Sequence, residues 1–343
     1  MARTAKMALR VNIIGKSNGV GLDRDMRLLV AALKAAGCEV VETRTGSRES
    51  GRRKSLFFKM LRAVSSKLLP ITAPRYDVNV MLEHVWTQYC RDARINVLVP
   101  NPDFFDRHDV KATPRVDCVW AKTVQAERIF RGMHTKVTHI GFDSDDRLKV
   151  DVPRHRTFFH LAGSSTLKGT QRLLEIWNTH PEWPMLVVAG RLKFKPPSAT
   201  NVRIHGGYLE DSFLKQLQNE SMIHICTSEA EGWGHYLVEA MSVGAAVITV
   251  DAPPMNFLVA PDRGWLLPCH ANGKQRLIPR FAFDAQASET LITQVIGLSD
   301  NGIKEMGDAA RQWYVSNHNA FPVRIKQALD EASVTIATSI SRA

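Results

Sequence analysis

Short apolar segments alternate with amphipathic helical patterns along the chain, and this alternation occurs twice. In the first half the apolar segments are RVNIIG (10–15), CEVVET (38–43), DVNVML (77–82), INVLVP (95–100), CVWAK (118–122) and KVTHIG (136–141). In the second half they are RTFFHLAG (156–163), MLVVAG (185–190), VRIHGG (202–207), MIHICTS (222–228) and AAVITVD (245–251). Apolar strands separated by helices are typical of parallel sheets that helices cover on both faces. We therefore predict an α/β protein with two doubly wound, Rossmann-like domains.

The length and the charge pattern suggest where these domains meet. A chain of 343 residues is long enough for two domains, and the charged stretch 143–156 is suited to a linker between the two patterns. We expect domains at 1–150 and 151–320, facing each other across a cleft at the carboxyl ends of their strands. A last helical segment, about 302–335, is interrupted by Pro322, and we expect residues 321–343 to cross back onto the first domain.

Composition excludes several classes of protein. Hydrophobic residues make up 44% of the chain and charged residues 23%, and no apolar run is long enough to cross a bilayer, so we expect a cytoplasmic protein. The five cysteines and twelve histidines are dispersed without metal-binding spacing, which favours free thiols and no metal site. The cysteines are Cys38, Cys90, Cys118, Cys226 and Cys269.

The formal net charge of +11 favours an acidic partner, which the charge alone does not identify. Nucleotide phosphates, a nucleic acid and an anionic membrane surface all fit. In the segment 47–69, basic residues surround a stripe of apolar residues at helical spacing. Such a segment either lies on the inner face of the cytoplasmic membrane or packs on the sheet with its charges in water.

The stretch SEAEGWGHYLVEAMSVGAAVITVD (228–251) combines a strand end, a glycine-rich turn and a helix. The first N–H groups of the helix and its dipole would attract an anion, and Gly232 and Gly234 would let a diphosphate approach the backbone. Glu231 and Glu239 lie eight positions apart, and their carboxylates accept hydrogen bonds from hydroxyl groups. A ligand with phosphates in its middle and hydroxyl-rich ends, such as a nucleotide-sugar, fits this layout.

This stretch resembles the E-x7-E signature of retaining glycosyltransferases with the GT-B fold, in the large family of sugar transferases called family four. Trp233 takes the usual aromatic position and Ala246 the usual proline position. The resemblance implies that Glu231 holds donor-sugar hydroxyls near the reacting carbon and that Glu239 binds the ribose. It also implies that the backbone of Gly234, His235 and Tyr236 holds the diphosphate.

The segment LAGSSTLKGTQRLLE (161–175) is similar to the phosphate-binding segment of the same family. Lys168 and Gly169 match the family's Lys-Gly pair, and Lys168 would neutralise the leaving diphosphate. Ser164 stands where the family usually has arginine, and either serine hydroxyls with the helix N-terminus or Arg191 could take over that role. In HGGYLED (205–211), Tyr208 or the neighbouring backbone would contact the base.

The first domain offers candidates for the acceptor side. The loop GKSNGVGLDRD (15–25) follows the first strand and lacks the third glycine of a dinucleotide fingerprint, so the resemblance assigns Asn18, Gly19 and Gly21 to the acceptor instead. Glu83 and His84 follow another strand. For His84 a catalytic role and a purely structural one both stay open.

The resemblance implies a reaction in which an acceptor hydroxyl attacks the anomeric carbon of a nucleoside-diphosphate sugar with retention of configuration. We expect no cofactor and no metal, and an acceptor that is a saccharide or a lipid-linked saccharide of bacterial envelope polysaccharide or glycolipid synthesis. Two alternative functions fit the same two-domain plan: a nucleotide-sugar epimerase, and a non-catalytic subunit that binds sugar nucleotides. A nucleic-acid binder is disfavoured, because no RNP, KH or zinc pattern occurs.

Overall fold

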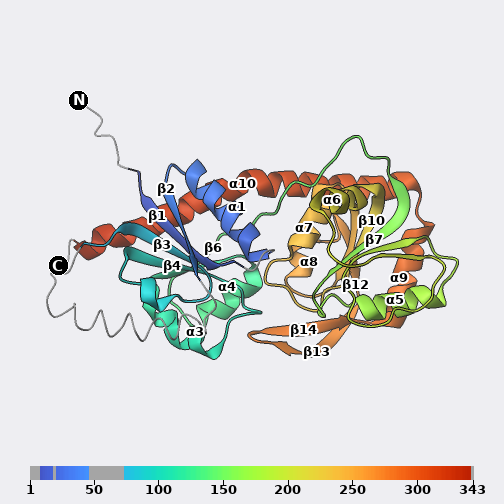
Figure 1. Cartoon of the computed structure of the whole chain (residues 1–343), viewed down its shortest axis with the longest axis horizontal. Helices are drawn as coiled ribbons and strands as arrows, with labels where there is room; N and C mark the ends of the chain where they lie inside the picture. Colours follow the sequence, from blue (N-terminus) through green and yellow to red (C-terminus); the bar gives the residue numbers. More distant parts are fainter. Residues whose placement is uncertain (1–7, 18–20, 46–72, 341–343) are drawn as a thin grey trace. The chain divides into compact units, whose positions relative to one another are not determined.

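The computed structural model describes residues 8–17, 21–45 and 73–340, with side chains up to Val334. The chain divides into two compact units (Figure 1). The first contains the residues up to Phe142 together with those from Ala320 on, and the second contains Asp143–Asn319. Each unit has one six-stranded sheet, and every strand pair described within these two sheets is parallel. The prediction of two doubly wound α/β units is confirmed.

The sheet of the first unit has the strand order β2-β1-β3-β4-β5-β6. Its strands are β1 (Arg10–Lys16), β2 (Glu39–Thr45), β3 (Tyr76–Glu83), β4 (Ala93–Pro100), β5 (Cys118–Ala121) and β6 (Val137–His139). Its helices before residue 142 are α1 (Gly21–Ala35), α3 (Arg107–Ala112) and α4 (Val124–Arg131), with short 3₁₀ turns at Thr87–Tyr89 and Thr113–Arg115. The order reverses direction between β1 and β3, which makes the ends of these two strands the switch point of this sheet.

Three buried asparagines fix the register of the central strands in the first unit. Asn12, Asn79 and Asn96 lie in register on β1, β3 and β4. Asn12 Nδ2 donates to Asn79 Oδ1 at 3.1 Å, and Asn79 Nδ2 donates to Asn96 Oδ1 at 2.9 Å. A slip of one residue would leave these amides without partners in an apolar core, which is costly.

The second unit has the strand order β12-β11-β10-β7-β8-β9. Its strands are β7 (His155–Gly163), β8 (Leu186–Gly190), β9 (Val202–His205), β10 (Ser221–Cys226), β11 (Ala246–Val250) and β12 (Gly264–Leu267). Its helices are α5 (Thr170–Thr179), α6 (Asp211–Glu220), α7 (His235–Ser242), α8 (Met255–Leu258) and α9 (Ala285–Gly297). Here the switch point lies between the neighbouring strands β7 and β10.

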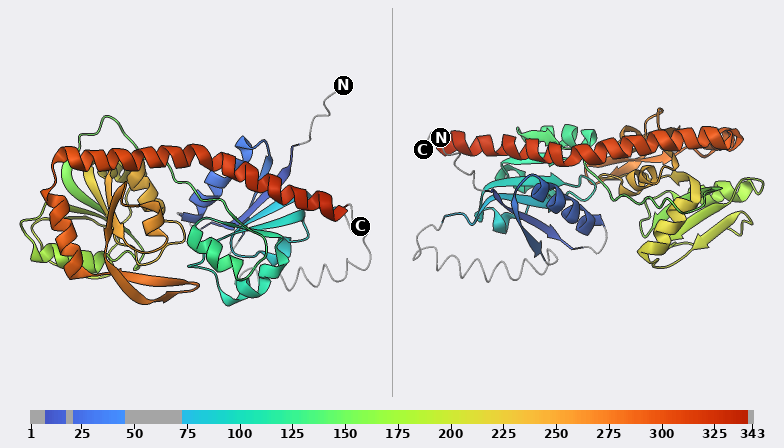
Figure 2. Two further views of the ribbon diagram at one scale, coloured as in Figure 1. Left: turned by 180° about the vertical axis from the view of Figure 1, so that it is seen from behind. Right: turned by 90° about the horizontal axis from the view of Figure 1, so that it is seen from above.

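A two-stranded antiparallel hairpin follows β12 and was not expected from the sequence. It consists of β13 (Cys269–Gln275) and β14 (Ile278–Phe283). In Figures 1 and 2 the hairpin extends beyond the six-stranded sheet of its unit. Most of β13 is exposed to solvent, so this strand has no apolar run that would mark it in the sequence.

The last helix, α10 (Asp300–Ile340), is longer than expected and is not broken at Pro322 (Figure 2). A proline inside a helix removes one hydrogen bond and crowds the preceding turn. Residues next to and beyond Pro322 are buried in the first unit, among them Phe321, Ile325 and Leu329. The Phe321 ring packs edge-on against Phe142 at 5.1 Å, so this packing compensates for the lost hydrogen bond.

The charged stretch 143–156 belongs to the second unit, and its first part is anchored there by buried residues. Arg147 is 5% exposed and donates from Nε to Gln218 Oε1 at 2.8 Å and from Nη1 to Asp211 at 2.6 Å. Buried charges are usually paired, and these partners meet that need. The expected functional domains 1–150 and 151–320 stay predictions.

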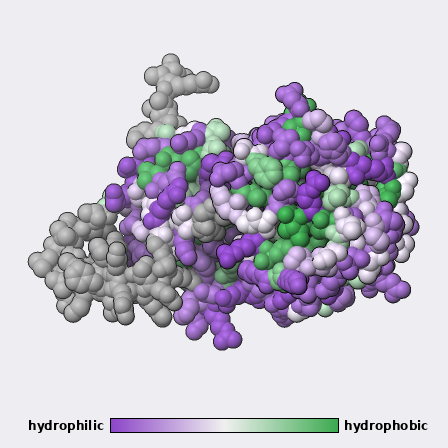
Figure 3. Space-filling view, turned by 45° about the vertical axis from the view of Figure 1, so that its right-hand side comes forward, coloured by the Kyte–Doolittle hydropathy of each residue, from purple (hydrophilic) through white to green (hydrophobic). Residues whose placement is uncertain are grey.

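The surface seen in Figure 3 is mostly hydrophilic, with separate hydrophobic patches. Within the described ranges, no helix combines the length and the apolar character that a membrane crossing requires. The basic segment 47–69, for which we expected either a membrane contact or packing on the sheet, lies outside the described residues.

Candidate functional site

Two turns meet at the switch point of the second sheet. The turn Ser164–Gly169 connects β7 to α5, and the turn from Thr227 to Gly234 connects β10 to α7. Gly169 has a left-handed backbone (φ 64°), and a Cβ there would come within 2.4 Å of the Thr227 carbonyl oxygen. Thr227 Oγ1 donates to the Lys168 carbonyl at 2.7 Å. The glycine therefore allows the two turns to touch.

This contact brings together Lys168 and Glu231, two of the predicted catalytic residues. The Lys168 ammonium lies 2.5 Å from Glu231 Oε1, and both side chains are less than one-fifth exposed. Glu231 Oε1 also accepts a hydrogen bond from Ser228 Oγ at 2.7 Å, and the Lys168 ammonium lies 3.6 Å from the centre of the Tyr236 ring. The result is one partly exposed cation and one carboxylate, oriented by groups on both turns.

Helix α7 begins at this same edge of the sheet. Gly234, the residue before the helix, has φ 104°, and a Cβ there would come within 2.9 Å of Leu237. The Tyr236 hydroxyl is buried and donates to Ser228 Oγ at 2.6 Å, and burial raises its pKa well above 10. Tyr236 thus stays a neutral donor and supports the residue that holds Glu231.

His235 and the buried Gly232 complete the predicted turn. His235 is partly exposed at the first position of α7, and its Nδ1 lies 2.8 Å from Ser144 Oγ. Trp233 Nε1 donates to the same Ser144 oxygen at 3.3 Å. This hydrogen bond therefore joins Trp233, the aromatic residue of the turn, to the stretch that follows Phe142.

Glu239 lies one turn into α7 and is 2% exposed. Its Oε2 accepts a hydrogen bond from Gln218 Nε2 at 3.2 Å. Gln218, at 1% exposure, in turn accepts from Arg147 Nε. A buried chain of three side chains from three segments thus positions the second carboxylate of the predicted motif.

A buried histidine of β7, His160, contacts β10 and the start of α5, the helix after the turn that follows this strand. His160 Nδ1 lies 2.8 Å from the Ile225 carbonyl of β10, and its Nε2 lies 2.8 Å from Thr170 Oγ1 at the start of α5. Burial lowers the pKa of His160 to about 4, so the ring is neutral at pH 7. It joins both strands of the switch point to the first turn of α5.

The three other residues that were predicted to bind the donor nucleotide-sugar lie at the surface of this unit. Ser164 and Arg191 are exposed, and the Arg191 backbone N–H donates to the Gly163 carbonyl at 2.7 Å. Tyr208 is 89% exposed in the segment between β9 and α6, so it is not a core residue. No contact in the structure tests their expected roles with a ligand.

In the first unit, His84 follows β3 at the switch point and forms a pair that the sequence analysis missed. His84 Nδ1 lies 2.8 Å from Asp109 Oδ2, and Asp109 is fully buried. Asp109 also accepts from the backbone N–H groups of Val85 at 3.1 Å and Asp106 at 3.2 Å. A carboxylate accepts hydrogen bonds, so Nδ1 of His84 is the donor in this pair.

Glu83, next to His84, has a left-handed backbone with φ 64°, which is uncommon outside glycine. Burial raises the pKa of its carboxyl group, whose Oε2 lies 3.9 Å from His84 Nε2. Of the predicted acceptor residues, Gly21 opens α1, whereas Asn18 and Gly19 lie outside the described residues. Asp109 lies 25 positions from His84, and no local pattern marks it as a partner.

Among the described residues, no group of three or more His, Cys, Asp or Glu side chains is arranged to hold a metal ion. The cysteines in the described ranges are all free thiols.

Comparison with known proteins identifies a family for part of the second unit. Residues 154–278 match the model of the family described as glycosyl transferases group 1. The matched segment is less than half of the chain, and it contains both turns and α7. A comparison with curated protein sequences finds no match.

Solved structures match the whole chain. A sucrose-phosphate synthase from Thermosynechococcus elongatus is 15% identical, with a TM-score of 0.69 over 96% of this chain and 100% of that one. A glycosyltransferase from Rickettsia africae ESF-5 is 14% identical, with a TM-score of 0.65 over 96% and 99%. Anabaena Alr3699/HepE in complex with UDP and glucose is 16% identical, with a TM-score of 0.63 over 95% and 100%. The chain therefore has the GT-B fold of these glycosyltransferases, and its residues 154–278 carry the glycosyl transferases group 1 match.

Proposed function

We propose that this protein is a retaining glycosyltransferase that uses a nucleoside-diphosphate sugar and needs no metal ion. Its acceptor is a hydroxyl group of a saccharide or of a lipid-linked saccharide, in the synthesis of a bacterial envelope polysaccharide or glycolipid. In this proposal Glu231 and Glu239 form the E-x7-E pair of family four.

One observation carries the proposal: Lys168 and Glu231 meet at 2.5 Å at the switch point of the second sheet. Open parallel sheets bind ligands at the carboxyl ends of the strands that flank this point. A cation beside the start of a helix suits a diphosphate, and a carboxylate beside it suits sugar hydroxyls. The group 1 match over the same segment supports this interpretation.

In the proposed reaction, the acceptor oxygen forms a bond to the anomeric carbon while the bond from that carbon to the diphosphate breaks. Lys168 and the amides at the start of α7 stabilise the negative charge that appears on the leaving diphosphate. The acceptor proton passes to that diphosphate on the same face of the sugar, so the configuration is retained. Glu231 holds the sugar hydroxyls and Glu239 the ribose.

The other predicted residues take supporting parts in this proposal. Gly232, Gly234, His235 and Tyr236 line the diphosphate, with Ser164, Gly169 and Arg191 beside it and Tyr208 against the base. In the first unit, His84 is our candidate for contact with the acceptor hydroxyl, oriented by Asp109, and Gly21 belongs to the same side.

Anabaena Alr3699/HepE has been solved with UDP-glucose, and a pneumococcal O-GlcNAc transferase named GtfA with UDP and GlcNAc. These ligands favour a UDP-sugar as the first donor to try. A panel of nucleotide-sugars should therefore include UDP, GDP and ADP forms, with thermal stability as the measure of binding.

The test compares wild type with Glu231→Gln and with the control Glu175→Gln, which removes an exposed carboxylate of α5. We expect Glu231→Gln to lower kcat/KM for transfer about 100-fold or more, with the control unchanged. Epimerised donor without any acceptor would instead identify an epimerase. Donor binding without turnover, under all acceptors, would identify a non-catalytic subunit.

A further inference from the structure

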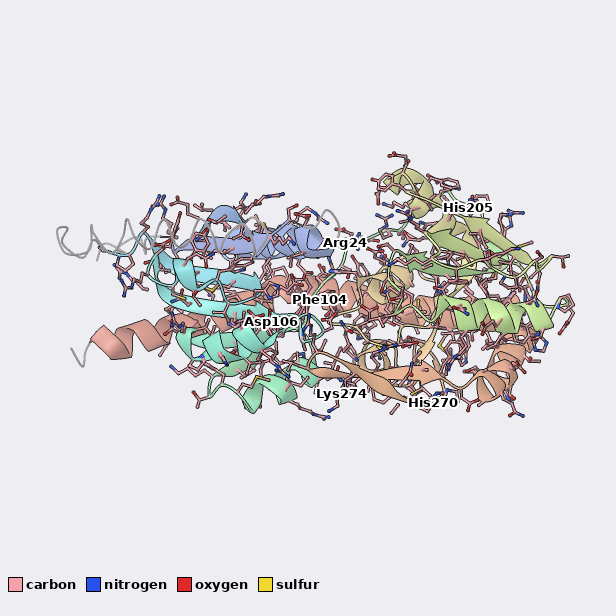
Figure 4. The ribbon with its side chains drawn as sticks, turned by 60° about the horizontal axis from the view of Figure 1, so that its bottom comes forward. Arg24, Phe104, Asp106, His205, His270 and Lys274 are labelled. Carbon is pink, nitrogen blue, oxygen red and sulfur yellow. The ribbon has the colours of Figure 1, made fainter. Side chains whose placement is uncertain are left out.

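The hairpin β13–β14 carries basic residues and no acidic ones. From Arg263 to Phe283 the sequence contains no Asp or Glu, whereas Lys274, Arg276 and Arg280 lie on the hairpin or its turn. His270 and Lys274, labelled in Figure 4, are exposed, and so is Arg276. A run of one sign on an exposed element attracts ligands of the opposite sign.

Arg280 belongs to the root of the hairpin and is already paired. Its guanidinium group donates from Nε to Glu229 Oε2 at 3.0 Å and makes a second, shorter contact from Nη2. Asn272 Nδ2 donates to the same oxygen at 3.1 Å, and the Phe281 N–H donates to the Glu229 carbonyl at 2.8 Å. The cations left for a ligand are Lys274 and Arg276, which have no ion-pair partner among the described residues.

The turn of the hairpin holds an arginine in an unfavourable conformation. Arg276 and Leu277 connect the two strands, and Arg276 has φ 52°. Glycine and asparagine are the usual residues at such positions in two-residue hairpin turns. An arginine there strains the backbone, so its charge serves a purpose other than stability.

Glu229 fastens this hairpin to both turns of the candidate site. It lies two positions before Glu231, and its N–H donates to the carbonyl of Leu167, next to Lys168, at 2.8 Å. The hairpin also starts at the carboxyl end of β12, and in a parallel sheet all carboxyl ends lie at one edge. The root of the hairpin therefore lies at the same edge of the same unit as the Lys168–Glu231 pair, and the cationic turn lies at the other end of its two strands.

We propose that Lys274 and Arg276 bind carboxylate groups of an acidic oligosaccharide, and that this oligosaccharide is the acceptor. The inference rests on the proposed function and names the class of its acceptor. A guanidinium group matches the geometry of a carboxylate. Single-stranded nucleic acid fits less well, because the aromatic residues of the hairpin, Phe281 and Phe283, lie away from the cationic turn and are partly buried and buried, respectively.

Calorimetric binding of two probes to the full chain tests the proposal: hexagalacturonate, which carries carboxylates, and the neutral maltohexaose. We expect wild type to bind the acidic probe about tenfold more tightly, and less tightly as salt rises from about 50 to about 300 mM. Arg276→Gln should weaken this binding about threefold, and Lys274→Gln/Arg276→Gln about tenfold.

The matched control is Arg203→Gln, which removes an exposed arginine from β9, the opposite edge strand of the same sheet. Its affinity for hexagalacturonate should equal that of wild type. Arg276→Gly removes the charge and relieves the backbone strain, so it should weaken binding without loss of stability. Unfolding therefore cannot explain its effect.

Three results would overturn the proposal: equal affinity for the two probes, full affinity in the double variant, or an equal loss in Arg203→Gln. Tighter binding of a 12-nucleotide DNA strand, lost in the same variants, would assign the hairpin to nucleic acid. Thermal shifts with nucleotide-sugars should be the same in wild type and the hairpin variants. If no nucleotide-sugar binds wild type, the proposed function fails while the hairpin measurement still gives its own answer.

Discussion

A buried amide, Gln218, helps to hold the second carboxylate of the candidate site in place. Its Oε1 accepts from Arg147 Nε at 2.8 Å and its Nε2 donates to Glu239 Oε2 at 3.2 Å. In the low dielectric of the protein interior, loss of either hydrogen bond would leave the charged group of that partner with one hydrogen bond fewer, which is costly. In the proposed function Gln218 is therefore a positioning residue, which would act on the donor through Glu239.

Replacing Gln218 by leucine should weaken donor binding. We expect Gln218→Leu to raise KM for the donor about tenfold with little change in kcat, because Glu239 would bind the ribose and not the reacting carbon. The control is Gln216→Leu on the same helix, whose amide donates to Glu220 Oε1 at 2.9 Å. A fall in kcat with KM unchanged would contradict the assigned role, and urea unfolding of both variants would reveal a purely structural effect.

Two left-handed glycines, one at the end of β7 and one in the turn after it, differ in their surroundings, which gives a second prediction. At Gly163 (φ 58°) a Cβ would meet nothing within 4 Å, whereas at Gly169 (φ 64°) it would come within 2.4 Å of the Thr227 carbonyl oxygen. Gly163→Ala should cost about 1 kcal/mol of backbone strain. Gly169→Ala should cost about 2 kcal/mol more, since the two turns must separate. Chemical unfolding measures both, and equal losses would mean that the turns separate freely.

At the residue scale, the sequence singled out candidate site residues, but it predicted few of the contacts that orient them. Lys168 and Glu231 could be expected near each other, because each follows a strand and strand ends share an edge. Asp109, Gln218 and Glu229 could not, since their partners lie far away in the sequence and no spacing marks them. The polar contacts that orient a site come from packing, which the pattern of apolar residues does not encode.

Among the elements, the buried strands were predictable because their apolar runs are continuous. RVNIIG (10–15) and RTFFHLAG (156–163) match β1 and β7 within one residue at each end. The β13–β14 hairpin has the opposite character, with a polar, exposed first strand. The helix α10 was expected to break at Pro322, but tertiary burial of Phe321 and Ile325 overrides the local preference.

The continuity of α10 gives an element-scale prediction. Because the helix already runs through Pro322, alanine at this position would restore a backbone donor without changing the path of the chain. Pro322→Ala should therefore raise the free energy of unfolding by about 1–3 kcal/mol. Val323→Ala, at a 56% exposed neighbour, serves as a control and should change it little. A loss of stability in Pro322→Ala would mean that the packing of the first unit requires the proline.

The basic segment 47–69 supports a separate element-scale prediction from its sequence alone. If its lysines and arginines bind an anionic bilayer surface, the chain should float with vesicles that contain about one-third phosphatidylglycerol and not with pure phosphatidylcholine. Arg52, Arg53 and Lys54 form its densest cluster. Their joint replacement by glutamine should abolish flotation. No binding to either vesicle by wild type would leave packing on the protein as the role of this segment.

For the whole molecule, acid stability should be set in large part by two neutral histidines in the core of the second unit. Burial lowers the pKa of His160 to about 4 and that of His224 to about 3. His224 is 2% exposed, and its Nε2 lies 2.8 Å from the Gln218 carbonyl. The pKa of a histidine in the unfolded chain is near 6.5. Between this value and the folded pKa, the unfolded chain therefore binds protons that the folded chain does not bind. The stability from each histidine is thus complete above pH 6.5 and is lost as the pH falls toward the folded pKa.

The expected result is a steep loss of stability in mild acid. Near pH 5, each histidine should add about 1.4 kcal/mol per pH unit to the slope of unfolding free energy against pH. His160→Asn and His224→Gln keep one donor each but do not titrate, so both variants should be less stable at pH 7 and show shallower slopes. His270→Gln, at an exposed position on the hairpin, is the control and should keep the wild-type slope. Denaturant unfolding from pH 7 to pH 4.5 measures all three. If the double variant His160→Asn/His224→Gln kept the wild-type slope, protonation of groups other than these two rings would govern unfolding in acid.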